Sequence, residues 1–162
     1  MCGITGNIHL EGTPSSPPVL QKMTDAIAHR GPDGEGHWIE GNVGLGHRRL
    51  AIIDLSPAGH QPMVSADHRY VLSYNGEVYN FRELRGELEA EGYWFRSRTD
   101  SEVVLNALGA WGIKALDRFN GMFALALWDR REQKLLLARD RYGIKPLYYS
   151  ERNGVFAFGS VV

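Results

Sequence analysis

Hydrophobic residues recur at helical spacing in the first part of the chain. The segment 17–29 begins with two prolines, which suit the start of a helix, and its apolar residues lie one to four positions apart: Val19, Leu20, Met23 and Ile27. This spacing predicts an amphipathic helix. The next segment, 30–46, is so rich in glycine and proline that it predicts only turns and short strands.

Two further helices are predicted from their start signals. Asn80 is followed three residues later by Glu83, which is the pattern of a capping box, and this helix is expected to end near Gly92. Thr99 and Glu102 repeat the signal ahead of another apolar stripe. The stripe predicts the buried face of a third helix and consists of Val103, Val104, Ala107, Leu108 and Trp111.

The last third of the chain changes to short apolar runs separated by turn-forming residues. The runs are GMFALALWD, KLLLARD, PLYYS and VFAFG, and the turns between them include DRREQ and ERNG. This alternation predicts antiparallel strands. Because MFALALW is apolar almost throughout, we expect its strand to be covered on both faces. The whole pattern predicts an α+β fold with layered sheets, and no linker or internal repeat interrupts it.

Composition limits the class of protein. The 162 residues fit one domain, and 43% of them are hydrophobic and 23% charged, as in ordinary globular proteins. Lys and Arg number 18 against 19 Asp and Glu, so no basic field attracts nucleic acid or an anionic membrane. The longest apolar run is too short to cross a bilayer, and no secretory signal is present. We expect a soluble, cytoplasmic chain that acts on a small molecule or a protein.

Several chemistries are disfavoured by residue spacing. Neither G-x-G-x-x-G nor G-x-x-x-x-G-K-[ST] occurs, so both nucleotide-binding fingerprints are missing. The six histidines form no H-E-x-x-H pair, and one cysteine cannot build a thiolate zinc site. We therefore expect no metal.

The position of the only cysteine, Cys2, is the strongest chemical signal. A lone cysteine is ordinarily read as a small buried hydrophobe, but removal of Met1 would leave this one with a thiol and an α-amine on the same residue. A terminal amine has a pKa of about 7.7 to 8.0, so it can accept the thiol proton near neutral pH without a histidine partner. Gly3 would let a substrate approach closely. Cys2 is therefore a candidate N-terminal nucleophile.

The stretch YNGEVYN allows two interpretations. Asn75 offers a side-chain amide and Gly76 an unshielded backbone N–H, the donors that a developing oxyanion needs. An Asn-Gly pair between apolar segments is equally a strong hairpin signal. The residues alone leave both interpretations open.

Seven blocks of the sequence resemble the class II glutamine amidotransferase domain, most of all the version at the N-terminus of glutamine-hydrolysing asparagine synthetase. The blocks cover nearly the whole chain in the family's order and are MCGITG, HRGPDGEG, GHRRLAIIDLSPAGHQPM, YNGEVYNFRELR, TDSEVVL, GMFALALWD and RDRYGIKPLYY. The resemblance implies an N-terminal-nucleophile hydrolase fold, in which two antiparallel sheets lie between helical layers (αββα).

The resemblance also implies roles for single residues. Cys2 matches the nucleophile that forms a γ-glutamyl thioester and releases ammonia, with its freed α-amine as the general base. Asn75 and Gly76 match the oxyanion donors. The block 29–33 is treated as architectural.

Recognition of glutamine follows from the same resemblance. Arg49 matches the residue that holds the α-carboxylate, Asp100 matches the acceptor for the α-ammonium, and Glu77 is a second candidate acceptor. The loop that closes over glutamine matches Leu50, Ile52 and Ile53. Without the resemblance, Arg49 reads as a surface charge and Asp100 as a residue that starts a helix.

Two features depart from the family's usual pattern. The family continues beyond FGSVV, so residues 1–162 are expected to be a glutaminase domain that is truncated or excised from a longer synthetase. No S-G-G-x-D-S pyrophosphate loop occurs. The domain is therefore expected to need no cofactor itself, with ATP and magnesium used only by a synthetase domain in the same polypeptide or in a partner protein.

Three functions remain open from the sequence. The first is hydrolysis of glutamine to glutamate and ammonia, as in asparagine biosynthesis. The second is a non-catalytic regulatory or assembly module that keeps the fold. The third is an N-terminal-nucleophile amidase acting on another amide. The combination of Arg49 and Asp100 favours free glutamine, because a zwitterionic amino acid needs a cation and a carboxylate.

Overall fold

Two antiparallel sheets form the centre of the molecule. The computed structural model describes residues 1–52, 54 and 56–162. Sheet A has the strand order β2-β3-β1-β9-β8 and sheet B the order β4-β5-β6-β7. The strands are β1 (Gly3–His9), β2 (Gly34–Glu40), β3 (Val43–Arg49), β4 (Met63–Val64), β5 (Tyr70–Val78), β6 (Gly121–Asp129), β7 (Lys134–Arg139), β8 (Tyr148–Arg152) and β9 (Val155–Gly159).

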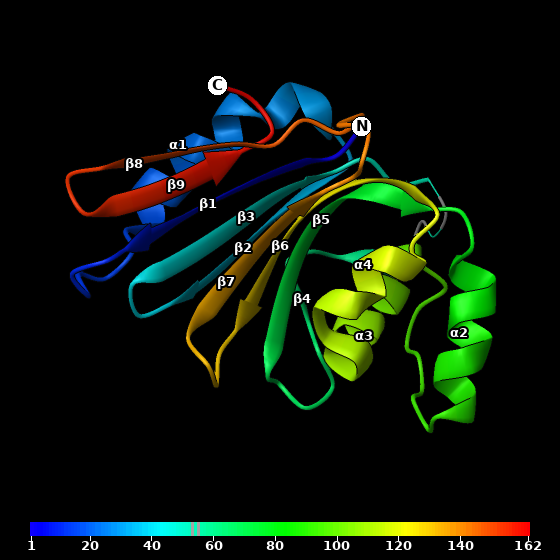
Figure 1. Ribbon diagram of the computed structural model, residues 1–162. Coiled ribbons are helices and arrows are strands. Elements are labelled where there is room, and N and C mark those ends of the chain that lie inside the picture. Colours follow the sequence, from blue (N-terminus) through cyan, green and yellow to red (C-terminus); the bar gives the residue numbers. More distant parts are fainter. Residues whose placement is uncertain (53, 55) are drawn as a thin grey trace.

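Helices cover the outer faces of both sheets, which gives four layers in the order αββα (Figure 1). Helix α1 (Pro17–Ala26) packs on sheet A, where Gly44 and Gly46 let Leu20 approach the strand closely. Helices α2 (Phe81–Ala90) and α3 (Asp100–Trp111) cover sheet B, and a short α4 (Ala115–Arg118) follows them. The implied fold class is confirmed.

Strand β6 lies at the middle of the stack and contributes to two hydrophobic cores. One core, between the sheets, contains Ala124, Ala126 and Trp128. The alternate side chains of the same strand enter the core between sheet B and its helices, together with residues of α2 and α3. The prediction that this strand is covered on both faces is confirmed, and the apolar run follows from it because neither face meets water.

The predicted helices are confirmed, but one predicted cap is wrong. The Thr99 side chain accepts a hydrogen bond from the Glu102 N–H (3.2 Å) at the start of α3, as expected. Asn80 does not cap α2 with its side chain. Its amide instead bonds the Arg118 carbonyl (3.0 Å) and the Asn120 N–H (3.0 Å), so a tertiary contact replaces the local one.

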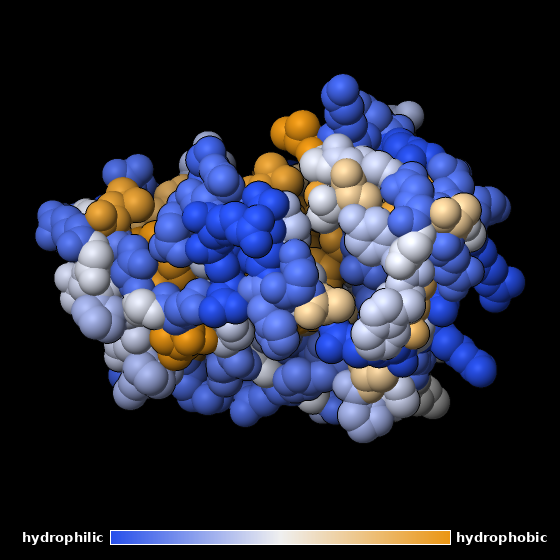
Figure 2. Space-filling model, turned by 90° about the horizontal axis from the view of Figure 1, so that it is seen from below, coloured by the Kyte–Doolittle hydropathy of each residue, from blue (hydrophilic) through white to orange (hydrophobic). Residues whose placement is uncertain are grey.

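The two sheets diverge at the edges β7 and β8. Strand β8 is exposed at all its positions, and an apolar groove of about 580 Å³ separates it from β7. Seen from below, the surface is mainly hydrophilic, with smaller hydrophobic areas among the polar side chains (Figure 2). In the described part of the chain, no helix has the length and apolar character needed to cross a membrane.

Candidate active site

The candidate nucleophile lies directly ahead of the central strand β1. Cys2 is half-buried, and its sulfur lies 3.3 Å from the Leu50 backbone nitrogen and 3.5 Å from the Leu50 carbonyl oxygen. Arg30 Nε donates to the Cys2 carbonyl oxygen (3.1 Å), and the Asp33 carboxylate accepts from the Ala51 N–H (2.9 Å). The block 29–33 thus holds both Cys2 and the chain that follows β3.

Asn75 and Gly76 belong to strand β5, so the hairpin interpretation is wrong. They pair with Ala124 and Phe123 of β6 in a register that continues on both sides of them. Glycine is required at position 76 because a Cβ there would lie 2.6 Å from the Met122 carbonyl oxygen. The tight packing against β6 therefore explains the Asn-Gly pair without a turn.

The Asn75 side chain carries a buried donor without an acceptor. Asn75 is only 2% exposed, and its Nδ2 has no hydrogen-bond partner among the described residues. Asn75 also lines the cavity described below. An unpaired buried amide costs about 1 to 3 kcal/mol. Asn75 therefore offers the cavity a donor that no described residue uses.

The Gly76 N–H points away from β6, towards the open side of β5. The N–H and carbonyl of Phe123, its partner, are both bonded to Asp140 on the other side of β6 (3.2 and 2.8 Å), which makes Gly76–Phe123 a pair without mutual hydrogen bonds. The neighbouring outward amides have side-chain acceptors: Tyr74 N–H bonds Gln61 Oε1 (2.7 Å) and Val78 N–H bonds Asp100 Oδ2 (3.1 Å). The Gly76 N–H lies between these two.

Asp100 occupies the first turn of α3 and is 5% exposed. Its Oδ2 accepts hydrogen bonds from the Tyr74 hydroxyl (2.8 Å) and from the Val78 N–H. Burial raises the pKa of Asp100 above its ordinary value, although the hydrogen bonds from Tyr74 and Val78 oppose the shift. A cation that reached this carboxylate would compensate the buried charge.

Arg49, at the end of β3, is positioned by backbone carbonyl oxygens. Its guanidinium bonds the Ser56 carbonyl (2.9 Å) and the Asp54 carbonyl, and it packs against Gly59. None of the ion pairs between described residues includes Arg49. Its charge therefore remains available to an anion from the cavity.

One cavity of about 350 Å³ brings the predicted residues together. This volume is ordinary for a small-molecule site. Ile53 lies outside the described residues. Every other predicted site residue lines the cavity: Cys2, Arg49, Leu50, Ile52, Asn75, Gly76, Glu77 and Asp100.

The sequence analysis missed several residues that line this cavity. Tyr74 and Gln61 join β5 to α3, and Lys145 enters from the segment after β7 although it is only 5% exposed. Burial lowers the pKa of Lys145. Its Nζ lies 2.9 Å from the Met1 sulfur, so Met1 itself occupies part of the cavity. Polar residues in a strand and a loop carry no periodic signal, which is why pattern analysis did not find them.

The layered αββα fold, with a cysteine directly ahead of β1, is the fold of the N-terminal-nucleophile hydrolases. Residues 1–162 match the family described as "Glutamine amidotransferase domain", and the chain belongs to this family. It is 40% identical to asparagine synthetase [glutamine-hydrolyzing] 3 of Bacillus subtilis, over all of this chain and 27% of that protein. It is also 41% identical to amidase chry2 of Gibberella zeae, over 93% of this chain and 24% of that protein.

A solved structure supports the fold assignment independently. Glutamine phosphoribosylpyrophosphate amidotransferase of B. subtilis, complexed with ADP and GMP, superposes with a TM-score of 0.82 at 21% identity. The match covers 98% of this chain and 42% of that one. The chain therefore shares this fold, and it spans about a quarter of the length of the asparagine synthetases and the amidase that it matches.

Proposed function

We propose that this domain hydrolyses the side-chain amide of free glutamine at Cys2 and supplies the ammonia to a synthetase. Membership of the glutamine amidotransferase family supports the reaction class. The single observation that carries the proposal is the cavity that combines the Cys2 sulfur with the buried Asn75 amide, whose Nδ2 has no partner among the described residues. A nucleophile and a preorganised donor are the two parts that acyl transfer needs.

The first step joins the Cys2 sulfur to the side-chain carbonyl carbon of glutamine. The thiol proton passes to the Cys2 α-amine, which is a base only after Met1 has been removed. The new S–C bond places negative charge on the former carbonyl oxygen. The Asn75 amide and the Gly76 N–H stabilise this charge as hydrogen-bond donors.

The second step breaks the bond between the carbonyl carbon and the amide nitrogen. The nitrogen takes a proton from the Cys2 ammonium and leaves as ammonia, which gives a γ-glutamyl thioester. Water then attacks the thioester carbon with the same amine as the base, and glutamate leaves as the thiol is restored.

Opposite charges in the lining of the cavity would recognise the two ends of the amino acid. Arg49 would bind the α-carboxylate through a guanidinium fork, and Asp100, with Glu77 nearby, would accept the α-ammonium. Leu50 and Ile52, in the chain that follows β3, also line the cavity. We also propose that Ile53 belongs to this closing loop.

The ammonia acceptor would be handled by a synthetase domain or partner, because the relatives named asparagine synthetase are about four times longer than this chain. ATP and magnesium would serve that synthetase. A second candidate, an amidase for a different amide, is favoured by the similarity to amidase chry2. Substrate comparison separates the two.

The test measures glutamate and ammonia release by the chain after removal of Met1. We expect free glutamine to be cleaved far better than glutaramate, which lacks the α-ammonium, and Cys2→Ala to be inactive. Arg49→Gln should raise KM strongly, whereas Arg48→Gln, a neighbour paired with Asp25 (2.6 Å) and Glu35 (2.7 Å), should leave KM nearly unchanged. Activity in Cys2→Ala would refute hydrolysis at Cys2. Equal cleavage of both amides would favour the amidase alternative.

A further inference from the structure

Tyr74 connects its own strand, β5, to β3, to α3 and to the segment that contains Gln61. Its N–H bonds Gln61 Oε1, its carbonyl accepts from His47 Nε2 on β3 (3.1 Å), and its hydroxyl donates to Asp100 Oδ2 on α3 (2.8 Å). Burial lowers the pKa of His47 to about 3, so the ring is neutral and its Nε2–H is a permanent donor. Tyr74 is 2% exposed and immediately precedes Asn75. Its position is thus fixed from three sides.

The hydroxyl of Tyr74 determines how the Asp100 carboxylate is oriented. Both donors, the hydroxyl and the Val78 N–H, bind the same oxygen, Oδ2. Asp100 also lines the cavity, and neither of these two donors binds its other oxygen, Oδ1, so we infer that Oδ1 meets a ligand. Gln61 reinforces the arrangement, since its Nε2 donates to Ser101 Oγ (3.3 Å) at the start of the same helix.

The charged and titratable groups around Asp100 act in opposite directions. Burial and the Glu77 charge disfavour the carboxylate, whereas the Tyr74 hydroxyl and the backbone N–H groups of Val78 and Ser101 favour it. Burial and the Asp100 charge keep the pKa of Tyr74 well above its ordinary value, so the hydroxyl remains a donor. Among the described residues, the other charged or titratable groups of the cavity lining belong to Met1 (its α-ammonium), Cys2, Arg49, Asp54 and Lys145.

We propose that Tyr74 is a positioning residue for substrate specificity: its hydroxyl holds the Asp100 side chain in place, with Oδ1 directed at the α-ammonium of the substrate. This inference rests on the proposed glutamine hydrolysis. Tyr74 does not touch the reacting atoms and acts through Asp100. A phenylalanine would fill the same space and leave Asp100 with one donor fewer, so the carboxylate would become protonated at a higher pH.

The test compares Tyr74→Phe with Tyr70→Phe, which removes a hydroxyl from a residue of the same strand whose ring packs near Gly109 of α3. In Tyr74→Phe we expect KM for glutamine to rise about tenfold and kcat to change less than about twofold, because a hydrogen bond to a charged group is lost. The acid limb of the kcat/KM profile should move to higher pH. Tyr70→Phe should show neither effect, and thermal unfolding should confirm that both variants fold.

The analogue glutaramate provides a second readout. Since it lacks the α-ammonium, Tyr74→Phe and the unmodified chain should cleave it equally, and the preference for glutamine should fall about tenfold in the variant. If Tyr74 had a purely structural role, Tyr74→Phe would lower the cleavage of glutamine and of glutaramate by the same factor. The proposal would be overturned if a folded Tyr74→Phe kept both the acid limb of the kcat/KM profile and the preference for glutamine over glutaramate.

A carboxyl-carbon NMR titration of Asp100 separates this inference from the proposed function. Its midpoint should move to higher pH in Tyr74→Phe and stay in place in Tyr70→Phe. If the unmodified chain released no glutamate, the proposed function would fail, and an unmoved midpoint would overturn the coupling by itself.

Discussion

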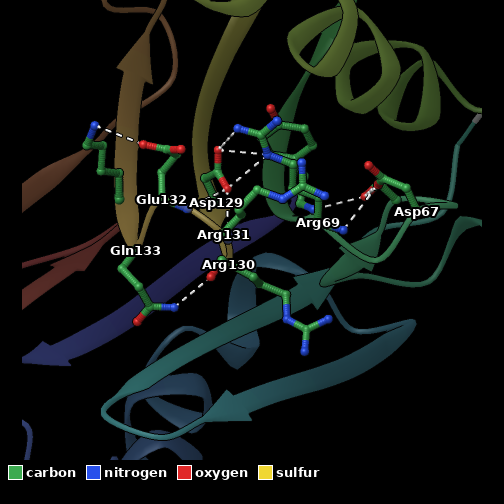
Figure 3. Close-up of polar contacts among 10 residues, drawn as sticks. Asp67, Arg69, Asp129, Arg130, Arg131, Glu132 and Gln133 are labelled. Atoms are coloured by element: carbon green, nitrogen blue, oxygen red, sulfur yellow. Dashed lines mark hydrogen bonds and ion pairs between the residues drawn. The ribbon is translucent and has the colours of Figure 1, made fainter.

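The paired strands β5 and β6 end in two contrasting environments. At the cavity end, Asn75 and Asp100 are buried, the Asn75 amide has no partner among the described residues, and the pKa of Asp100 is raised. At the other end, Arg69 bonds Asp129 twice through Nε (3.1 Å each) and once through Nη2 (2.7 Å), as Figure 3 shows. There the Arg69 hydrogen bond lowers the pKa of Asp129.

The same strand pair therefore supports polar groups in two opposite ways. At the distal end, the end far from the cavity, the charges of Arg69 and Asp129 pair with each other and lie near water. They therefore add little to stability, and neither is available to a ligand in the cavity. The groups at the cavity end are removed from water and incompletely satisfied, which opposes stability. A ligand that brings an oxyanion and an ammonium would satisfy both. We infer that the difference distinguishes a binding site from a structural ion pair.

The largest expected effect comes from the peptide bond between Met1 and Cys2. A chain that retains Met1 or carries an N-terminal tag has an amide in place of the α-amine, so we expect no measurable glutaminase activity. The same tag after Val162 should leave activity intact. Intact mass and glutamate release are to be measured on the same samples. Full activity in a sample that quantitatively retains Met1 would exclude the amine as the base.

The second effect contrasts two buried asparagines. Asn75→Ala should lower kcat by about 10² to 10³ and leave the melting temperature nearly unchanged, because the donor that is removed has no partner among the described residues. Asn7→Ala removes an amide that bonds Ser15 Oγ (2.7 Å), so it should lower the melting temperature and spare kcat. A loss of stability without a loss of kcat in Asn75→Ala would assign that amide to the structure.

The third effect concerns the two aspartates and the sign of their pH dependence. Asp100→Asn should lower kcat/KM for glutamine about a hundredfold, since the α-ammonium loses its partner. The pKa of Asp100 is raised by folding, so its stabilisation is present at low pH and lost as pH rises through that pKa. Asp100→Asn should therefore melt no lower than the unmodified chain at pH 7.

Asp129→Asn should show the opposite sign. Its pKa is lowered by folding, so its stabilisation is present above the unfolded value and is lost as pH falls through the folded value. This variant should melt lower at pH 7 and approach the unmodified chain in acid, with normal kcat/KM. Melting curves of both variants from neutral to acid pH provide the test. If Asp100→Asn and Asp129→Asn changed the melting temperature in the same direction at pH 7, the comparison would be contradicted.

The smallest effect is expected where the distal end meets sheet A. Arg130 bonds the Glu40 carboxylate of β2 (2.9 Å through Nε), and the pair is exposed to water. Arg130→Gln should change kcat/KM by less than about twofold, because an exposed pair is screened and lies at the distal end. Kinetics at low and high salt provide the check, and a large kinetic loss would contradict the separation of the two ends.

The sequence predicted the elements better than their connections. The apolar spacing in 17–29 and the capping signal at Thr99 correctly predicted helices α1 and α3. The apolar run 122–128 correctly predicted a strand covered on both faces, which is β6. These features are local or follow from burial. The Asn80 cap failed because its amide found partners 38 and 40 residues away, and such contacts leave no local pattern.

The candidate site divides in the same way. The chemistry of Cys2 could be inferred from its place in the chain, whereas the roles of Arg49 and Asp100 came from resemblance to a family. Of the two interpretations of Asn75 and Gly76, the hairpin turn was wrong, because pairing with β6 overrides the preference of an Asn-Gly pair for turns. Tyr74 and Lys145 meet only because strand β5, helix α3 and the segments after β3 and β7 come together around the cavity, and such contacts leave no local pattern.

The most direct test of the account is covalent labelling by a glutamine analogue that carries an electrophilic ketone in place of the amide. The account predicts that one molecule of analogue attaches to Cys2 of the processed chain, that glutamine prevents labelling, and that glutaramate protects poorly. Asp100→Asn should be labelled slowly, while Asp129→Asn should be labelled at the normal rate. Labelling of Cys2 that glutamine does not slow, or that proceeds equally in both variants, would contradict the claim that this cavity is a glutamine site.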